Sequence, residues 1–381
     1  MDMALTSAQK KDFSDRGFSR RNFGRIATLI AAGSTLPFYS EYALAQRGRT
    51  GALQAGAVKI DSNENPLGPC PEAAEAIRDI VKDGGRYMFD SPSEFQALMA
   101  GVEGLSPNYV QAYAGSSMPL HWSVLAFTSP ARAFVSADPT FEAGEGAARF
   151  VGAKTVRVPL AKDHAHDVKA MLAAGDKAGL FYVCNPNNPT GTLTSRADLE
   201  YLLANKPAGS VVLLDEAYIH FSDARGALDL VAADKDLIVL RTFSKIYGMA
   251  GLRAGAALAR PDLLARIRSF GNTWMPITSI AGAMASLRAS TLVAERRKIS
   301  KDTREDVFGF FDKHQFKYIP SVANFFMVDV GRPGREIADA LRRDNVIVGR
   351  SWSSHPNHIR VTVGTPEEMT KFKAAFLKAM A

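Results

Sequence analysis

Short apolar runs recur along the middle of the chain, and each ends in turn residues or in a polar or charged group. They lie at 132–139, 154–160, 179–186, 210–218 and 236–242, with amphipathic stretches such as 195–206 between them. Runs of this length are typical of strands buried on both faces. Their alternation with helical patterns predicts an α/β fold, with a mostly parallel sheet covered by helices.

The pattern changes beyond about residue 275. A long helical pattern covers 279–314, candidate strands follow at 325–330 and 359–365, and a last helix ends the chain. This order predicts a large domain at 85–274 and a smaller C-terminal α+β domain at 275–381. Residues 46–84 are expected to form an arm that contributes to the small domain or to a dimer, with Pro71 opening a helix that reaches about Ile80.

Length and composition narrow the class of protein. The 381 residues are 46% hydrophobic and 22% charged, enough for one large domain or two medium ones. The formal net charge is +7, but the positive residues are scattered and form no basic block. Nucleic-acid binding is therefore not expected, and a mildly basic surface suits anionic small molecules.

The first 45 residues do not have the pattern of a folded domain. Arg20 and Arg21 are followed by Phe23, by a short apolar stretch and by the small-x-small sequence at 43–45. The stretch is too short and too broken to span a membrane. Residues 1–45 resemble a twin-arginine export signal, which predicts a periplasmic or secreted protein. The alternative is an N-terminal tail of a cytoplasmic protein.

Two cysteines, Cys70 and Cys184, are too few for a disulfide framework or a cysteine metal site. We expect two small buried apolar side chains, and the sequence leaves their pairing open.

Polar side chains follow three of the expected strands. Asn188 lies after the third strand, Asp215 and Tyr218 end the fourth, and Lys245 follows the fifth. Ligands bind at the carboxyl ends of such strands. Each residue alone fits a turn, a helix cap or a solvated charge. Together they suit one chemistry, because a lysine forms a Schiff base with an aldehyde and a carboxylate keeps a pyridine nitrogen protonated.

The motifs "NPNNPTG" (185–191), "DEAY" (215–218) and "SKIYGMAGLRAG" (244–255) resemble those of fold-type I pyridoxal-phosphate enzymes, aminotransferase class I and II. Within them the chain is most similar to the histidinol-phosphate aminotransferase-like branch. The resemblance covers nearly all of 58–375 and includes "NENPLGP", "RYMFD", "DPTFEAG", "VANFFMVD" and "IRVTVGTPEEM" in family order. It implies the cofactor pyridoxal 5'-phosphate (PLP) in the large domain and no metal.

The resemblance also implies roles for individual residues. Lys245 would bind the cofactor and move the substrate α-proton, Asp215 would pair with the pyridinium nitrogen, and Asn188 and Tyr218 would hydrogen-bond the ring's phenolic oxygen. Phe141 would stack on the ring. The phosphate would be held by Ser116, Ser117, Thr242, Ser244 and Arg253.

Other roles concern the substrate and the second subunit. Arg360 would clamp the α-carboxylate, with Asn65 and Asn324 on the substrate side. Tyr87 matches a tyrosine that reaches the phosphate from the other subunit, which implies a homodimer with shared active sites.

Four positions depart from the family pattern. Met118 stands where an acidic residue is usual, Pro119 lies inside a helix start, Phe141 replaces a tyrosine, and Leu67 stands where an aromatic residue is frequent. They leave the amino donor open.

We expect a PLP-dependent transaminase acting between an L-amino acid, or an amine such as histidinol phosphate, and a 2-oxo acid. A PLP-dependent lyase or decarboxylase on the same scaffold is the alternative, and a non-catalytic PLP-binding protein is less favoured because the full residue set is present.

Overall fold

The computed structural model describes residues 11–12, 14–18, 24, 55–271 and 274–381. Most of the expected export signal, including Arg20, Arg21 and the 43–45 sequence, lies outside the described residues. The same holds for the beginning of the expected arm.

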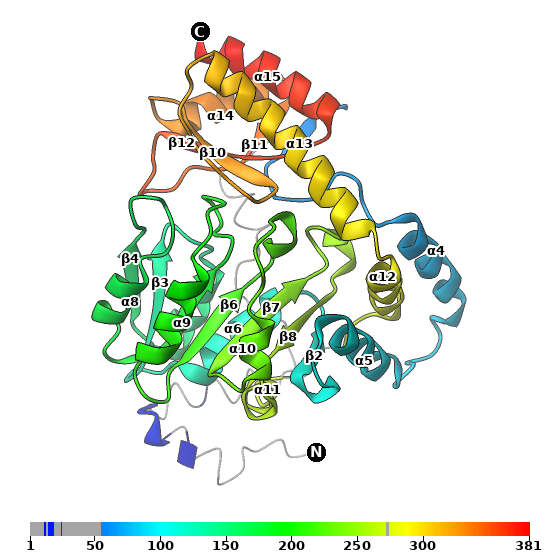
Figure 1. The fold of residues 1–381 in the computed structure, drawn as a ribbon, viewed down its shortest axis with the longest axis vertical. Helices are drawn as coiled ribbons and strands as arrows, with labels where there is room; N and C mark the ends of the chain where they lie inside the picture. The colour runs from blue at the N-terminus through cyan, green and yellow to red at the C-terminus, as the bar shows by residue number, and fades with distance from the viewer. Residues whose placement is uncertain (1–10, 13, 19–23, 25–54, 272–273) are drawn as a thin grey trace.

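A seven-stranded sheet forms the centre of the large unit (Figure 1). Its strands, in spatial order, are β2 (Val110–Tyr113), β8 (Gly255–Leu258), β7 (Leu237–Thr242), β6 (Val211–Asp215), β5 (Ala178–Cys184), β3 (Ala133–Asp138) and β4 (Thr155–Pro159). Strand β8 runs antiparallel to both β2 and β7, and the other strand pairs of the sheet are parallel. The expectation of a mostly parallel sheet is therefore confirmed.

Helices cover both faces of this sheet because its strands are apolar on both sides. In β6, Val212 and Leu214 belong to one apolar core, whereas Val211 and Leu213 belong to another. The first core is closed by α4 (Pro71–Ile80), α5 (Ser91–Glu103), α8 (Val168–Ala174), α9 (Arg196–Asn205), α10 (Leu228–Ala232) and α12 (Ile277–Arg288). The second is closed by α6 (Ser117–Phe127), α7 (Ala143–Val151) and α11 (Pro261–Arg268).

A smaller unit lies against one end of the large sheet (Figure 1). It contains the antiparallel strands β12 (His358–Thr362), β10 (Phe325–Asp329) and β9 (Tyr318–Ile319), and the parallel pair β1 (Val58–Ile60) and β11 (Val346–Val348). Helices α13 (Leu292–Lys313), α14 (Gly334–Arg343) and α15 (Pro366–Met380) pack around a third apolar core. Strand β1 thus ties the segment before α4 to this unit.

The structure divides the helical pattern that the sequence suggests for 279–314. Helix α12 ends at Arg288, α13 begins at Leu292, and the two axes are bent by 85°. Ala289 leaves the helical backbone, with ψ at 86°, so the hydrogen-bond ladder stops there. Within the described part of the chain, no single helix is long and apolar enough to cross a membrane; only this bent pair passes such a test jointly.

Arg16 and Phe18 contact the large unit, although the sequence pattern did not indicate any fold for this segment. Arg16 donates to the carbonyl oxygens of Leu125 and Thr128 at the end of α6, at 2.8 Å each. Phe18 is buried in the core that α6 covers.

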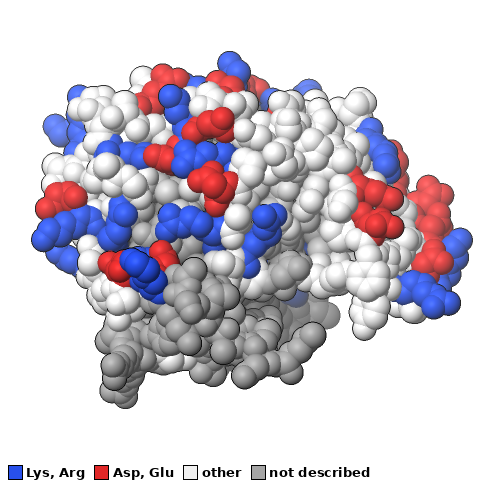
Figure 2. Space-filling model, turned by 90° about the horizontal axis from the view of Figure 1, so that it is seen from below, with Lys and Arg blue, Asp and Glu red and all other residues white. Residues whose placement is uncertain are grey.

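Acidic and basic side chains are interspersed on the face seen from below in Figure 2. Among the described residues on that face, the Lys and Arg side chains form separate groups with acidic and uncharged residues between them (Figure 2). This agrees with the scattered positive charge of the sequence.

Candidate active site

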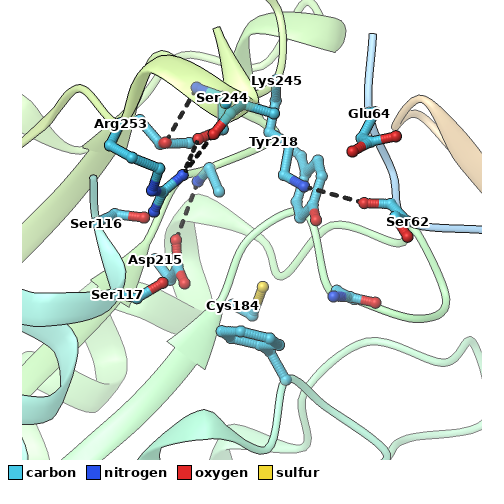
Figure 3. A pocket seen from close by; sticks show the side chains of 16 residues that line it. Ser62, Glu64, Ser116, Ser117, Cys184, Asp215, Tyr218, Ser244, Lys245 and Arg253 are labelled. Carbon is cyan, nitrogen blue, oxygen red and sulfur yellow. Dashed lines mark hydrogen bonds between the residues drawn. The ribbon is translucent and has the colours of Figure 1, made fainter. Parts of the chain in front are cut away.

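A pocket of about 390 Å³ opens where β5, β6 and β7 end, which is the size of a small-molecule site. The N-terminus of α6 and the segment after β1 complete its wall (Figure 3). Its lining includes ten residues expected from the resemblance, namely Ser116, Ser117, Phe141, Asn188, Asp215, Tyr218, Thr242, Ser244, Lys245 and Arg253. The fold therefore gathers in one pocket residues that are spread over 138 positions of sequence (253 − 116 + 1 = 138).

Lys245 is half-buried, three residues after the end of β7. Its Nζ atom lies 3.4 Å from the carbonyl oxygen of Ser62 and 5.4 Å from the centre of the Tyr218 ring. Figure 3 shows the amine directed into the pocket between these two groups. A primary amine held in this way can attack the carbonyl carbon of a bound aldehyde.

Asp215 ends β6 and is almost completely buried. One carboxylate oxygen accepts the backbone N–H of Ala217 at 3.1 Å, and the other accepts the hydroxyl of Tyr182 at 3.0 Å. Burial raises the pKa of Asp215 from 3.8 to about 6, against the opposing effect of the Tyr182 hydrogen bond. A buried carboxylate of this kind is stabilised by a cation placed against it in the pocket.

Asn188 and Tyr218 are both buried, and side chains from the smaller unit and from the segment after β1 hold them in place. Asn188 lines the pocket, and its Oδ1 atom accepts from Arg360 at 2.7 Å. The hydroxyl of Tyr218 accepts from Asn63 at 3.2 Å, and its ring meets Phe325 edge-on. Amide and phenol can both donate to an anionic oxygen.

Another part of the pocket wall suits a phosphate group. Ser116 caps and Ser117 begins α6, and the first N–H groups of a helix can bind an anion. Arg253 donates to Ser244 Oγ at 3.1 Å and lies in the left-handed region with φ at 57°. A side chain at Gly115 would overlap the Arg253 guanidinium, so the glycine leaves room for this cation.

Four expected residues do not line this pocket. Arg360 is buried behind Asn188, where it also donates to the carbonyl oxygen of Asp61 at 2.7 Å. Asn65 and Asn324 direct their amide groups to backbone carbonyls, of Ile246 and of Asn63 and Glu64 respectively. They fix the segment that carries Ser62. Tyr87 is exposed on the surface.

Apart from Ala217, Ala250 and Gly251, which lie within the quoted motifs, four residues of the site were not expected from the sequence. Ser62, Glu64 and Cys184 line the pocket, and Tyr182 contacts Asp215 from behind it. Cys184 could have been found because it precedes "NPNNPTG" at a strand end. The others depend on how β1 and β5 are placed. Both cysteines are buried, and they are not joined in a disulfide.

The residues present fit PLP. The serines, Arg253 and the α6 terminus suit its phosphate, Asp215 suits its ring nitrogen, and Lys245 suits its aldehyde. Among the described residues, no group of three or more His, Cys, Asp or Glu side chains is arranged to hold a metal ion.

Comparison with known proteins agrees with this fit. Residues 55–376 match the family described as aminotransferase class I and II. Histidinol-phosphate aminotransferase 2 of Pseudomonas fluorescens is 37% identical over 333 residues, covering 85% of this chain and 89% of the relative. The Symbiobacterium thermophilum histidinol-phosphate aminotransferase is 35% identical, with 85% and 90% coverage.

A solved structure shares both fold and cofactor type. The Sinorhizobium meliloti histidinol-phosphate aminotransferase, in complex with pyridoxal-5'-phosphate, superposes with a TM-score of 0.79 at 27% identity. The superposition covers 92% of this chain and 96% of the Sinorhizobium meliloti chain. From its motifs, its pocket and these matches, the chain belongs to the aminotransferase class I and II family of PLP-dependent enzymes.

Proposed function

We propose that this PLP-dependent aminotransferase moves an amino group between an L-amino acid, or an amine such as histidinol phosphate, and a 2-oxo acid in the pocket described above. The observation that carries the proposal is the convergence of Lys245 and Asp215 on one pocket with a phosphate cradle. When bound, PLP supplies an aldehyde that captures the amino group and a ring that accepts electrons from the α-carbon.

The chain's own groups have distinct tasks in this proposal. Lys245 holds the cofactor and then takes and returns the α-proton, and Asp215 keeps a positive charge on the ring nitrogen. Asn188 and Tyr218 orient the ring, and Phe141 stacks on it. Arg360, which lies behind Asn188, binds the substrate carboxylate.

A panel of amino donors, including histidinol phosphate, tests this function. Each donor is added to the yellow holoenzyme without a 2-oxo acid, and conversion of the cofactor is followed by absorbance. A transaminase loses the yellow colour with its true donor and regains it when a 2-oxo acid is added. A protein that binds no PLP, or a Lys245→Ala variant that still turns over, would contradict the proposal.

The lyase and decarboxylase alternatives differ in which bond breaks. If Arg360 binds the α-carboxylate of the substrate, that contact opposes decarboxylation. It does not oppose β-elimination. Measuring carbon dioxide, pyruvate and amino-acid products from each donor separates the three outcomes. A single product with an intact carbon skeleton supports transamination.

We also propose a homodimer with shared active sites. Tyr87, Phe89 and Trp274 form an exposed aromatic cluster with ring centres 5.4–5.9 Å apart, which suits burial against a second copy. In that dimer Tyr87 of one subunit would reach the phosphate bound by the other. Sedimentation measurements test the assembly.

Export by a twin-arginine signal at 1–45 remains a separate proposal, supported by the order of Arg20-Arg21, the apolar stretch and the 43–45 sequence. Fractionation of cells tests it. Full-length protein found only in the cytoplasm would contradict export, whereas periplasmic protein that begins near residue 46 would support it.

For the domains, we propose a division near residue 275, with 85–274 as the large unit, 275–381 as the small one and 46–84 as an arm. The separate apolar core around α13, α14 and α15 supports it. Helix α12, just after the proposed boundary, nevertheless packs on α4 and α5 in the core of the large unit.

A further inference from the structure

The Tyr182 side chain contacts Asp215 from the side away from the pocket. Tyr182 is completely buried in β5, and its hydroxyl lies 3.0 Å from Asp215 Oδ2. The second carboxylate oxygen is already bonded to the N–H of Ala217. One carboxylate oxygen of Asp215 is thus held by the backbone of Ala217 and the other by the side chain of Tyr182.

Strand register sets this contact. Cys184 lies opposite Asp215 in the parallel β5–β6 pair, and Tyr182 lies opposite Leu213, two residues earlier. Tyr182 and Asp215 are thus diagonal neighbours on one face of the sheet, a separation that an aromatic side chain can bridge. The Phe134 ring lies 6.1 Å from the Tyr182 ring and supports it from β3.

The direction of the hydrogen bond is fixed by chemistry. Burial raises the pKa of the Tyr182 phenol well above its ordinary value, and the nearby Asp215 charge adds to the effect. The phenol therefore keeps its proton and donates it to the carboxylate. A charge-assisted hydrogen bond of this kind favours the ionised form of the acceptor.

Few other charges act on Asp215. Lys245, from the loop after β7, favours the carboxylate anion, and Glu216, the next residue, opposes it. Cys184 lies beside Tyr182 on β5. Helix α6, which packs on β5 and β6, contributes one titratable group, His121, and burial lowers the pKa of His121 to about 4, so it is neutral at physiological pH.

We propose that Tyr182 is a positioning residue for the cofactor chemistry, because its hydroxyl holds Asp215 as an oriented anion toward the PLP ring nitrogen. The inference rests on the proposed function of this pocket. It adds a residue behind the pocket wall to the set that the family motifs indicate. Tyr182 itself does not line the pocket.

The Tyr182→Phe variant removes only the hydroxyl. Without it, Asp215 is harder to ionise, so PLP affinity and the rate of cofactor conversion should fall most on the acid side. We expect the dissociation constant for PLP to rise about tenfold at pH 6.5, with a smaller change at pH 8.5. The acid limb of the kcat/KM profile should move to higher pH.

The matched control is Phe134→Leu, which loosens packing on the same tyrosine ring without changing a hydrogen bond to Asp215. Any effect of that variant should be the same at both pH values. PLP binding is measured by equilibrium dialysis, and the absorbance of bound PLP is recorded across the pH range. The unfolding midpoint of the cofactor-free proteins checks that both variants fold.

The outcomes separate this inference from the proposed function. If the wild-type protein binds PLP and transaminates but Tyr182→Phe leaves both pH profiles unchanged, the positioning role is wrong and the function stands. An equal loss at every pH would also overturn it, because that is the signature of packing alone. If the wild-type protein binds no PLP, the proposed function fails first.

Discussion

Asp215 carries a free-energy cost in the cofactor-free protein. Its pKa is raised to about 6 in the fold, mainly by burial, from an ordinary 3.8. A carboxyl group whose pKa is raised by folding contributes its full stabilisation below the pKa that it has in the unfolded chain. That stabilisation is lost as the pH rises through the folded-state pKa of about 6. At neutral pH the loss is roughly 3 kcal/mol at most. PLP with a protonated ring nitrogen would offset it.

The Asp215→Asn variant separates stability from function at this residue. Asparagine does not titrate, so the cofactor-free variant should be more stable than wild type, by about 1 kcal/mol more at pH 7.5 than at pH 5. Its transaminase rate should fall ~10²–10³-fold, because the ring nitrogen loses its counter-charge. Denaturant unfolding at the two pH values and donor turnover measure both effects. A variant less stable than wild type at pH 7.5 would contradict the burial argument.

Gly115 tests the phosphate cradle. A methyl group there would overlap the flexible end of Arg253, and the φ of +87° is unfavourable for alanine. We expect Gly115→Ala to displace the guanidinium and to raise the dissociation constant for PLP about tenfold or more. The control is Gly101→Ala on α5, where an added methyl meets nothing within 4 Å. Equal affinities for the two variants would show that Arg253 does not hold the phosphate.

At the scale of elements, the sequence predicts the positions of the five parallel strands β3 to β7, and four of them are buried apolar runs. The fifth, β4, was also expected to be buried but is an edge strand in which only Val158 is buried. Strands β2 and β8 were not predicted. The sequence of β8 is Gly-Ala-Ala-Leu, small residues that have no strand preference and are placed there by pairing with β2 and β7. The contact between Tyr182 and Asp215 was also out of reach, since it depends on the β5–β6 register.

Arg16 and Phe18 allow a prediction about the N-terminal part of the chain. Arg16 binds carbonyl oxygens at the end of α6, where the helix dipole favours a cation. Arg16→Ala in the full-length chain should lower the unfolding free energy by ~1–2 kcal/mol, measured by denaturant unfolding. Lys11→Ala is the control, because its exposed pair with Asp15 contributes little.

A chain that begins at residue 46 extends this test. It should have the stability of the Arg16→Ala variant or lower, because it also lacks Phe18. If Arg16→Ala and Lys11→Ala have equal unfolding free energies, the contacts of Arg16 with α6 do not stabilise the fold. Removal of residues 1–45 would then leave the stability of the folded enzyme unchanged.

At the scale of the whole molecule, residues 275–381 support the pocket without lining it. The pocket wall comes from the large unit and from Ser62 and Glu64 after β1, whereas Arg360, from β12 of the small unit, fixes Asn188. Movement of one unit relative to the other would therefore act on the pocket through the contact between Arg360 and Asn188. The sequence pattern indicates both units, but their contact follows only from the folded chain.

The exposed aromatic cluster gives the last prediction, on assembly. Tyr87, Phe89 and Trp274 are 72%, 71% and 47% exposed, which is costly for aromatic side chains that already pack on each other. We expect the combined variant Phe89→Ser and Trp274→Ser to weaken the dimer at least tenfold in sedimentation equilibrium. Tyr87→Phe should leave assembly intact and weaken PLP binding, since it removes only the hydroxyl that we propose reaches the phosphate in the other subunit.

The matched control for assembly is Tyr201→Ser on α9, an exposed aromatic residue outside the cluster. It should change neither the dimer nor PLP affinity. If the Phe89 and Trp274 variant stays dimeric, the interface lies elsewhere. In that case Tyr87→Phe should not change PLP affinity, because Tyr87 does not line the pocket of its own subunit. Agreement of the two measurements is therefore what supports a shared active site.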